Sequence, residues 1–525
     1  MRLTHLGLAT ALANGILYCC ALPLWEGFDE PVHYGYVESL SVEHNFPVLL
    51  KTNISKEIRE SFDMTPLSRL LSQTLPGTMS FEQWARLSEA DKQLRKSKLA
   101  LIPAETRKTV SSFLNYEAQQ APLAYLIYAP LDALIAGLPL AARILVLRMG
   151  GTVVSCLLTY FALIQLLDLL QVKDGLRLSV ITCVFASQMM WATVAHVGND
   201  VLAVPLVVWF LTRLAVTVKK SSGRNVLILS SLFALGLVTK AYFLAFAPVF
   251  VVLLGWVTWR RNIRWTVIAL AIAIVLAIAG PWYGRNLSLY GGLSGTQQSI
   301  AGIGWREALK ALPQIDWLRS QQEFARWSLW TGNWSFLSFS QITLDIELWL
   351  LRVALLVYFA FWRRVQRPEL WLWAACGCFG LSLIYQTCVT WVATQGESRF
   401  AEPWYAQGVI VCVWVLCFVG LSRWRAYGRW IAAALVLIFM WIAIMTYLAK
   451  LLPYYSSGVT RANLDGLWRW WNNHPTQKLA SVTLAPASVV IVLLILFIGM
   501  VIALSALIIR RLFRDVDQGH SVVAG

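Results

Sequence analysis

Long apolar stretches, separated by shorter polar segments, recur along the whole chain. A helix needs about 20 mostly apolar residues to cross a bilayer, and twelve stretches approach that length. We therefore predict an all-α polytopic membrane protein, with about twelve transmembrane helices in one domain over residues 1–525. The predicted spans lie near 3–25, 141–170, 177–196, 201–218, 225–239, 241–259, 265–281, 346–362, 369–388, 404–421, 429–447 and 486–509.

A thirteenth apolar segment, "QAPLAYLIYAPLDALIAGLP" at 120–139, is treated differently. If it crossed the membrane, later basic clusters such as "WRRNIR" at 259–264 and "SRWRAYGR" at 422–429 would fall outside. Short loops rich in Lys and Arg stay on the cytoplasmic side. We expect a re-entrant or interfacial helix at 120–139, with both termini of the chain cytoplasmic.

The outer face then receives three long loops, at 26–138, 282–345 and 448–485. They are expected to carry juxtamembrane helices, and they hold many of the carboxylates and histidines. The inner loops are short and basic. Any chemistry is therefore predicted on the extracytoplasmic face. The first span, 3–25, is expected to stay uncleaved because no small-x-small cleavage site follows it.

Composition supports a membrane protein, with 58% hydrophobic and only 14% charged residues. The net charge of +16 could indicate a nucleic-acid partner, but the basic residues gather at the predicted inner turns. We therefore expect contact with membrane lipid and no nucleic acid. The nine cysteines all lie in or beside apolar stretches, so no disulfide framework is predicted.

Two adjacent acids, Asp29 and Glu30, follow the first span directly, and His33 comes three residues later. One interpretation is a helix start with two solvated acids, since Pro31 favours the first turn of a helix. The other is a general base facing a cavity, because partial desolvation raises the pKa of a carboxyl group. A pair binding a divalent cation, Mg²⁺ or Mn²⁺, also stays open.

Cationic residues reach the same face from separate segments of the chain. Lys240 lies at a junction between two apolar stretches, Arg285 follows the span at 265–281, and Arg399 precedes the span at 404–421. Such a set suits a phosphate-bearing lipid, because Lys and Arg both bind phosphate well. The turn "AHVGND" adds three polar residues to this face, His196, Asn199 and Asp200.

These motifs, in this order, resemble the GT-C superfamily of integral-membrane glycosyltransferases. The similar elements are the "DE" that opens the first loop, "YEAQQAPLAYLIYAPL" at 116–131, "LRMGGTVVSCLLTY" at 147–160, "VGNDVLAVPL" at 198–207, "GLVTKAYFLAFAPV" at 236–249 and "GESRFAEPW" at 396–404. The resemblance covers roughly 400 residues. It is greatest to the protein O-mannosyltransferase and lipid A aminoarabinose transferase branch, or to a bacterial branch with "DEP-x-H" in its first loop.

The resemblance implies an enzyme of the bacterial inner membrane that takes a sugar from a polyprenyl-phosphate-linked donor. In that family the first acid, here Asp29, activates the acceptor hydroxyl, and Glu30 would support it or share a metal. Lys240, Arg285 and Arg399 would hold the phosphate of the sugar donor. The remaining candidates, for the acceptor or the cavity, are His33, Glu117, His196 and Asp200.

Several alternatives stay open. The single Asp200 in "GND" is not a DxD pair, which weakens the case for an obligate metal. The chain carries no soluble C-terminal domain of the oligosaccharyltransferase kind, which argues against a peptide-sequon acceptor. A transporter or flippase of a lipid-linked saccharide would also need outer cations, and a polysaccharide polymerase or ligase would use a related sugar donor. The acceptor could be a lipid, a glycan or a protein.

Overall fold

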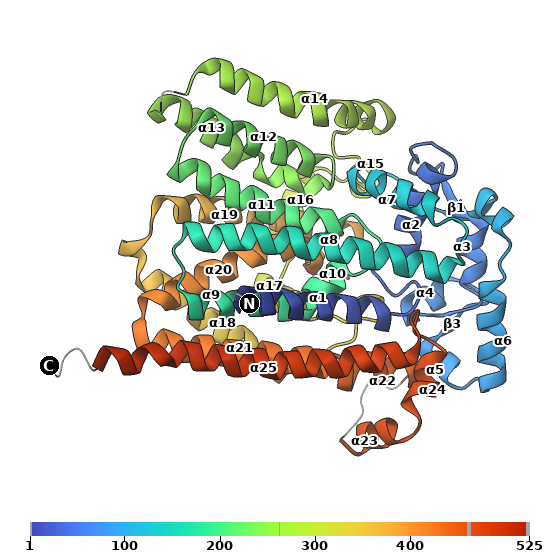
Figure 1. The fold of residues 1–525 in the computed structure, drawn as a ribbon. Helices are drawn as coiled ribbons and strands as arrows, with labels where there is room; N and C mark the ends of the chain where they lie inside the picture. The colour runs from blue at the N-terminus through green and yellow to red at the C-terminus, as the bar shows by residue number, and fades with distance from the viewer. Residues whose placement is uncertain (1–2, 262, 459–463, 521–525) are drawn as a thin grey trace.

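The computed structural model describes residues 3–261, 263–458 and 464–520. It is a bundle of long, roughly aligned helices with a cap of short elements at one end (Figure 1). The bundle helices are α1 Leu3–Ala21, α8 Leu140–Leu169, α9 Asp174–Ala186, α10 Gln188–Val194, α11 Asp200–Lys219, α12 Gly223–Leu237, α13 Ala247–Arg261, α14 Trp265–Tyr290, α18 Gln341–Ala360, α19 Arg367–Ala393, α20 Gln407–Arg423, α21 Arg425–Met445 and α25 Ala487–His520. The prediction of an all-α polytopic membrane protein is confirmed.

Each of the twelve predicted spans falls on a helix, but fewer are long and apolar enough to cross a membrane. Among the described residues nine helices meet that requirement, or ten if α9 and α10, which meet at a 52° bend, form one span. Two of the predicted spans, at 225–239 and 346–362, do not meet it. Helix α12 has only 15 residues, and α18 carries three charged residues, Asp345, Glu347 and Arg352.

The short elements gather at the end of the bundle opposite the turns that join α13 to α14 and α20 to α21 (Figure 1). Because those turns carry basic clusters, we call the opposite end the outer end. The first loop contributes α2 Glu30–Ser41, β1 Asn53–Ser55, α3 Lys56–Ser61, β2 Pro66–Leu67, α4 Arg69–Thr74, β3 Met79–Ser80, α5 Phe81–Ala85, α6 Glu89–Ala100, η1 Ala104–Lys108, β4 Val110–Leu114 and α7 Leu123–Leu134. The two small sheets pair β1 with β4, antiparallel, and β2 with β3, parallel; the sequence did not predict them.

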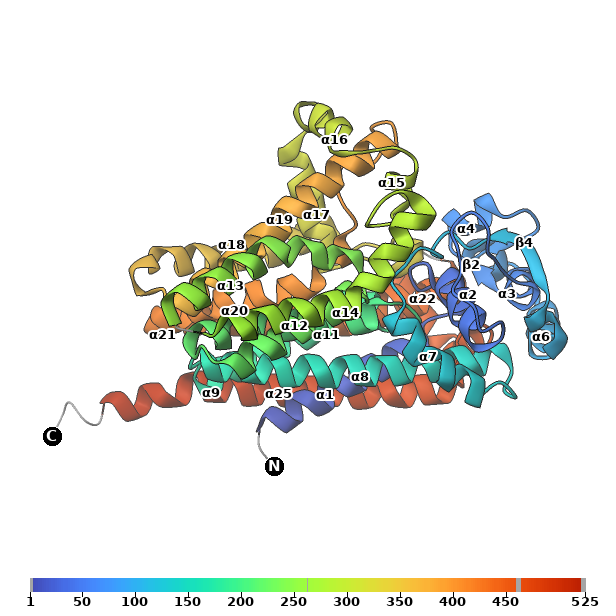
Figure 2. The same ribbon diagram turned by 90° about the horizontal axis from the view of Figure 1, so that it is seen from above.

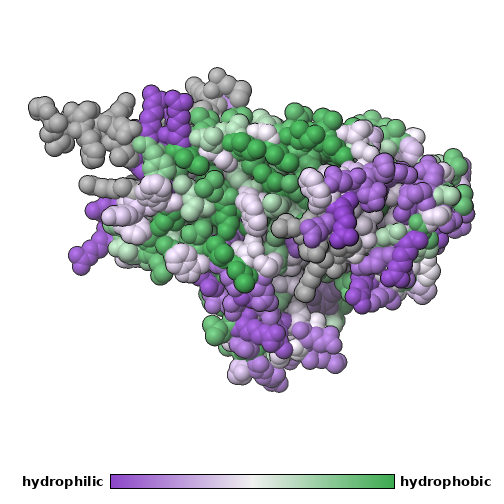
Figure 3. Space-filling model, turned by 90° about the horizontal axis from the view of Figure 1, so that it is seen from below, coloured by the Kyte–Doolittle hydropathy of each residue, from purple (hydrophilic) through white to green (hydrophobic). Residues whose placement is uncertain are grey.

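The later loops contribute η2 Ala241–Phe246, α15 Gln297–Ile300, α16 Trp305–Ala311, η3 Leu312–Gln314, α17 Trp317–Leu329, η4 Asn333–Ser335, η5 Trp362–Arg364, η6 Pro403–Ala406, the π-helical η7 Thr446–Leu451, α22 Leu452–Ser457, α23 Leu464–Asn472 and α24 Pro475–Ala480. Helix α16 projects sideways from the bundle together with the end of α19 (Figure 2). Hydrophobic residues cover much of the bundle's visible surface, whereas hydrophilic residues dominate the capped end and the projection (Figure 3).

Helix α7 is the segment that was expected not to span, and its length agrees with that expectation. It has 12 residues, and at about 1.5 Å per residue it rises far less than a bilayer core. Its first amide, from Leu123, donates to the carbonyl of Val238 at 2.9 Å. The helix also packs against α2. It is therefore held at the outer end, across the start of the first loop.

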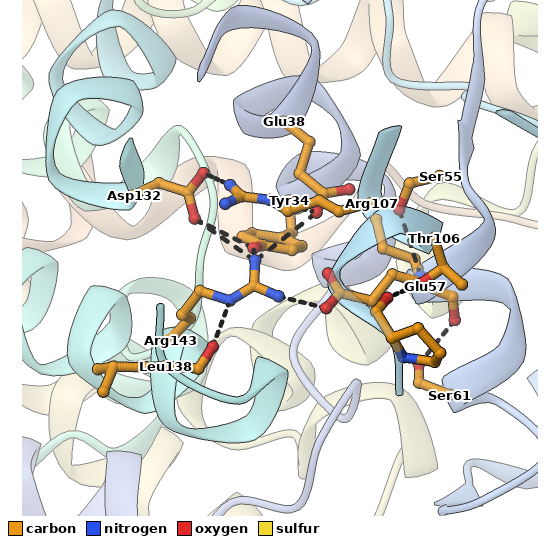
Figure 4. Close-up of polar contacts among 12 residues, drawn as sticks. Tyr34, Glu38, Ser55, Glu57, Ser61, Thr106, Arg107, Asp132, Leu138 and Arg143 are labelled. Atoms are coloured by element: carbon orange, nitrogen blue, oxygen red, sulfur yellow. Dashed lines mark hydrogen bonds and ion pairs between the residues drawn. The ribbon is translucent and has the colours of Figure 1, made fainter. Parts of the chain in front are cut away.

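A buried ionic network fixes the first loop to α7 and α8 (Figure 4). Arg107 of η1 pairs with Asp132 of α7 and, at 3.2 Å, with Glu38 of α2. Arg143 of α8 pairs with Glu57 of α3 and lies 3.8 Å from Glu38. Burial, followed by the nearby Glu57 charge, raises the pKa of Glu38 to about 8. Two arginines and three carboxyl groups thus meet in one buried network.

A second buried pair closes the junction between α1, α2 and α8. The guanidinium of Arg148 donates to both carboxylate oxygens of Glu30, and both side chains are fully buried. It also donates to the carbonyls of Leu22 at 2.7 Å and Pro23 at 2.9 Å. The amide of Val197 donates to Glu30 at 3.0 Å. One ion pair thus joins four segments, and we call it the Glu30–Arg148 clamp.

The substitution Glu30→Gln should destabilise the protein by about 3–5 kcal/mol, because it leaves the buried Arg148 without a counter-charge. Thermal unfolding of the detergent-solubilised protein, followed by tryptophan fluorescence, measures the change. The matched control is Asp168→Asn, which breaks an exposed pair with Arg177 and should cost under about 1 kcal/mol. A Glu30→Gln protein as stable as the control would contradict the clamp.

Candidate active site

Asp29 has a left-handed backbone, and its side chain does not cap the helix that follows. Its φ of 54° is left-handed, a conformation that few residues other than glycine adopt. Among the described residues its carboxylate accepts no cap hydrogen bond from α2; it accepts one from the Tyr116 hydroxyl at 2.7 Å. The interpretation as a simple helix-start signal therefore does not fit this side chain.

The environment of Asp29 makes its carboxylate a better proton acceptor than that of a solvated aspartate. Its side chain is only partly buried, whereas the adjacent Glu30 has no exposed surface. Desolvation raises the pKa of Asp29 to about 6, against the opposing effects of the Tyr116 hydrogen bond and the Lys240 charge. A carboxylate of this pKa is ionised at pH 7, yet more basic than a solvated aspartate.

Two more carboxyl groups interact electrostatically with Asp29. Burial, followed by the Asp29 charge, raises the pKa of Glu117 to about 8. The same two causes raise the pKa of Glu402 to about 7. Glu117 is bonded to the amide of Gln120, which in turn accepts a hydrogen bond from Asn199 at 3.0 Å. At neutral pH the site therefore holds both ionised and protonated carboxyl groups.

Lys240 supplies a buried positive charge to this group of acids. Its ammonium lies 2.6 Å from Asp200 and 4.9 Å from the ring centre of Tyr405, and it is only 7% exposed. Its charge influences both Asp29 and Glu117. An ammonium has three N–H donors, and Asp200 takes one. The cation is thus held in place by Asp200 and keeps donors for a second anion.

Two neutral histidines line the same region. Burial lowers the pKa of both His33 and His196. His33 is bonded through Nδ1 to the Tyr125 hydroxyl at 2.8 Å, and His196 Nδ1 lies 3.1 Å from the carbonyl of Ala192. A Cβ on Gly198 would lie 3.1 Å from Nε2 of His196 and 3.4 Å from Cδ2 of His33. The two rings therefore lie close together.

The two predicted arginines have contacts of their own, and their assignment to the phosphate of the sugar donor stays a prediction. Arg285 donates to the carbonyl of Pro47 at 2.7 Å and stacks on Trp282. In the described part of the chain its Nη1 is buried without a partner, so it keeps a donor for an anion. The carbonyl of Arg399 accepts from Ser320 at 2.6 Å, which ties its backbone to α17. The contacts of these two arginines join them to other segments, not to Asp29 or Lys240.

Glu30 differs from its expected role beside Asp29. Arg148 donates to both of its oxygens and the amide of Val197 donates to one, so most of its acceptor positions are already used. Within residues 3–261, 263–458 and 464–520, no three His, Cys, Asp or Glu side chains gather closely enough to hold a metal. Glu30 is thus chiefly the partner of Arg148, and a divalent cation shared with Asp29 stays a prediction.

The structure adds residues that sequence reasoning did not select. Tyr116 and Glu402 both act on Asp29, and both lie inside motifs that carried the family resemblance, "YEAQQ" and "SRFAEPW". Arg148 also lies in such a motif, "LRMGGTVVSCLLTY", and a charged residue within a long apolar helix is itself a signal of a buried partner. In all, the predicted residues brought together are Asp29, His33, Glu117, His196, Asp200 and Lys240.

Comparison with known proteins gives little further information. No family model matches the chain, and no curated protein matches its sequence. One solved structure with a related outline is the crystal structure of ArnT from Cupriavidus metallidurans bound to undecaprenyl phosphate. The two chains share 12% identity at a TM-score of 0.48, over 97% of this chain and 77% of the other. Likeness at this level establishes neither an activity nor a ligand for this chain.

Proposed function

We propose that this protein is a membrane glycosyltransferase that moves a sugar from a polyprenyl-phosphate-linked donor to an acceptor at the outer face. A polyprenyl chain stays in lipid while its phosphate and sugar lie at the interface. A site for such a molecule needs a cation near the ends of membrane helices and a base beside it. Lys240 and Asp29 meet these two needs.

In the proposed reaction the carboxylate of Asp29 takes the proton of the acceptor hydroxyl. The acceptor oxygen forms a bond to the anomeric carbon as the bond from that carbon to the phosphate oxygen breaks. Polyprenyl phosphate leaves with the bonding electron pair, and Lys240 stabilises its increased negative charge. Glu117 or Glu402, in its protonated form, can donate a hydrogen bond to a sugar or phosphate oxygen.

One observation supports the proposal most strongly. The carboxylate of Asp29 does not cap α2; it accepts a hydrogen bond from Tyr116 and is influenced by the charge of the buried Lys240. A base of raised pKa close to a buried cation is what the proposed transfer requires. A carrier would need to bind and release its cargo, but it would not need a base of raised pKa at this position.

The substitution Asp29→Asn should reduce transfer by about 100-fold or more, because it removes the proton acceptor and keeps the size of the side chain. The measurement is mass spectrometry of polyprenyl-linked sugars in cells whose only copy of the gene carries the substitution. The unused sugar donor should accumulate, as in a deletion strain.

The matched control is Asp63→Asn, an acid of the first loop that is about half exposed and pairs with Arg59. It should leave the lipid-linked sugars at wild-type levels. A normal transfer product from Asp29→Asn cells would contradict the base assignment. Normal product with a defect in its export would instead indicate a carrier.

The rate constant kcat/KM should rise with pH through about 6 and then level off, as Asp29 loses its proton. The substitution Tyr116→Phe removes a hydrogen bond that favours the carboxylate, so the pKa of Asp29 rises further. The acid limb of the profile should move about one pH unit upward. The readout is the pH dependence of sugar transfer by purified protein.

Tyr128→Phe is the control, because in the described chain the hydroxyl of Tyr128 has no hydrogen-bond partner. Its profile should overlay that of the wild type. An acid limb that does not move in Tyr116→Phe would show that the titrating group is not Asp29.

A further inference from the structure

A pocket separate from the Asp29 site opens at the outer end, between α17 and the start of α18. Its volume is about 250 Å³. It is lined by Glu323, Arg326, Trp327, Ser338, Gln341, Leu344 and Phe400. The proposed reaction uses none of these residues. The pocket therefore needs an explanation of its own.

The walls of the pocket combine aromatic rings with charged side chains that are already paired with other residues of the chain. Trp327 and Phe400 lie 5.5 Å apart between ring centres, at 61° to one another. Arg326 is held by both carboxylate oxygens of Asp345, at 2.6 and 2.7 Å. Glu323 accepts from Arg319 at 2.8 Å. Ring faces beside such polar groups provide both stacking surface and fixed hydrogen-bonding partners.

This chemistry favours a hydroxyl-rich ligand over an anion. The charge of Arg326 is neutralised by Asp345 and that of Glu323 is paired with Arg319, so Arg326 is not left free to bind a phosphate. A sugar hydroxyl can donate to a carboxylate and accept from a guanidinium, and the apolar face of a sugar ring can lie against Trp327. The volume is below the roughly 300–1,000 Å³ of sites for drug-sized molecules, which suits one small ring.

Aromatic contacts connect this pocket to Asp29. Trp327 lies 5.5 Å from Phe336, and Phe336 lies 6.3 Å from Phe28, measured between ring centres. Phe28 directly precedes Asp29 and stacks on Trp404 at 4.2 Å. Two ring contacts therefore link the pocket wall to the residue that precedes Asp29.

The geometry points to a saccharide subsite: the pocket beside Trp327 and Phe400 binds one sugar unit through ring stacking and hydrogen bonds to Glu323 and Arg326. The assignment depends on the proposed function only for the molecule from which the sugar unit comes. The sugar unit belongs either to an acceptor glycan or to the sugar donor, and both present the same chemistry.

Binding is tested without any transfer reaction. The probes are the methyl glycosides of glucose, galactose, mannose and N-acetylglucosamine, and binding to the full-length protein is measured by saturation-transfer NMR. At least one probe should bind saturably to the wild type. Trp327→Ala and the isosteric Glu323→Gln should each weaken that binding tenfold or more. Inorganic phosphate should not compete with the bound glycoside.

Trp305→Ala is the matched control, because Trp305 is 61% exposed on the neighbouring helix α16 and lies outside the pocket. It should bind the probe like the wild type. No saturable binding of any of the four glycosides would overturn the inference. So would unchanged affinity in both Trp327→Ala and Glu323→Gln.

The source of the sugar is resolved by the transfer assay. If Trp327→Ala raises KM for the acceptor and not for the sugar donor, the pocket holds the acceptor; the reverse result assigns it to the sugar donor. If neither KM changes, the inference fails. That failure is distinct from failure of the proposed function, which depends on Asp29 and not on Trp327.

Discussion

The Glu30–Arg148 clamp is the interaction on which the outer end depends. A guanidinium buried among apolar helices is tolerated only when a carboxylate and further acceptors surround it, and here Glu30 and two backbone carbonyls do so. The clamp fixes the end of α1, the start of α2 and the turn at Val197 against α8. The remaining site residues are positioned relative to this fixed junction.

The two adjacent acids consequently have different roles. Glu30 is fully buried and forms an ion pair with Arg148, so its role is structural. Asp29, one residue earlier, lies in a left-handed conformation that turns its carboxylate away from α2 and toward Tyr116. The clamp provides the over-determined surroundings in which such a backbone conformation persists. Paired acids in a sequence therefore need not share one function.

Much of the fold followed from the sequence, because each predicted span falls on helical structure and the basic turns that join α13 to α14 and α20 to α21 lie at the same end of the bundle. Spacing alone could not reveal which polar residues meet. The partner of Glu30 lies 118 residues away, within an apolar helix. Lys240 was expected to bind the phosphate of a ligand, and the structure shows that it also pairs with Asp200 of the chain itself.

An experimental structure of the protein with a bound polyprenyl phosphate tests the central claim most directly. The claim is that Asp29 and Lys240 share one site with a lipid-borne phosphate between them. The account predicts phosphate oxygens within about 4 Å of the Lys240 ammonium, and the carboxylate of Asp29 facing the same space. A phosphate bound away from Lys240, or an Asp29 side chain directed into bulk solvent, would contradict it.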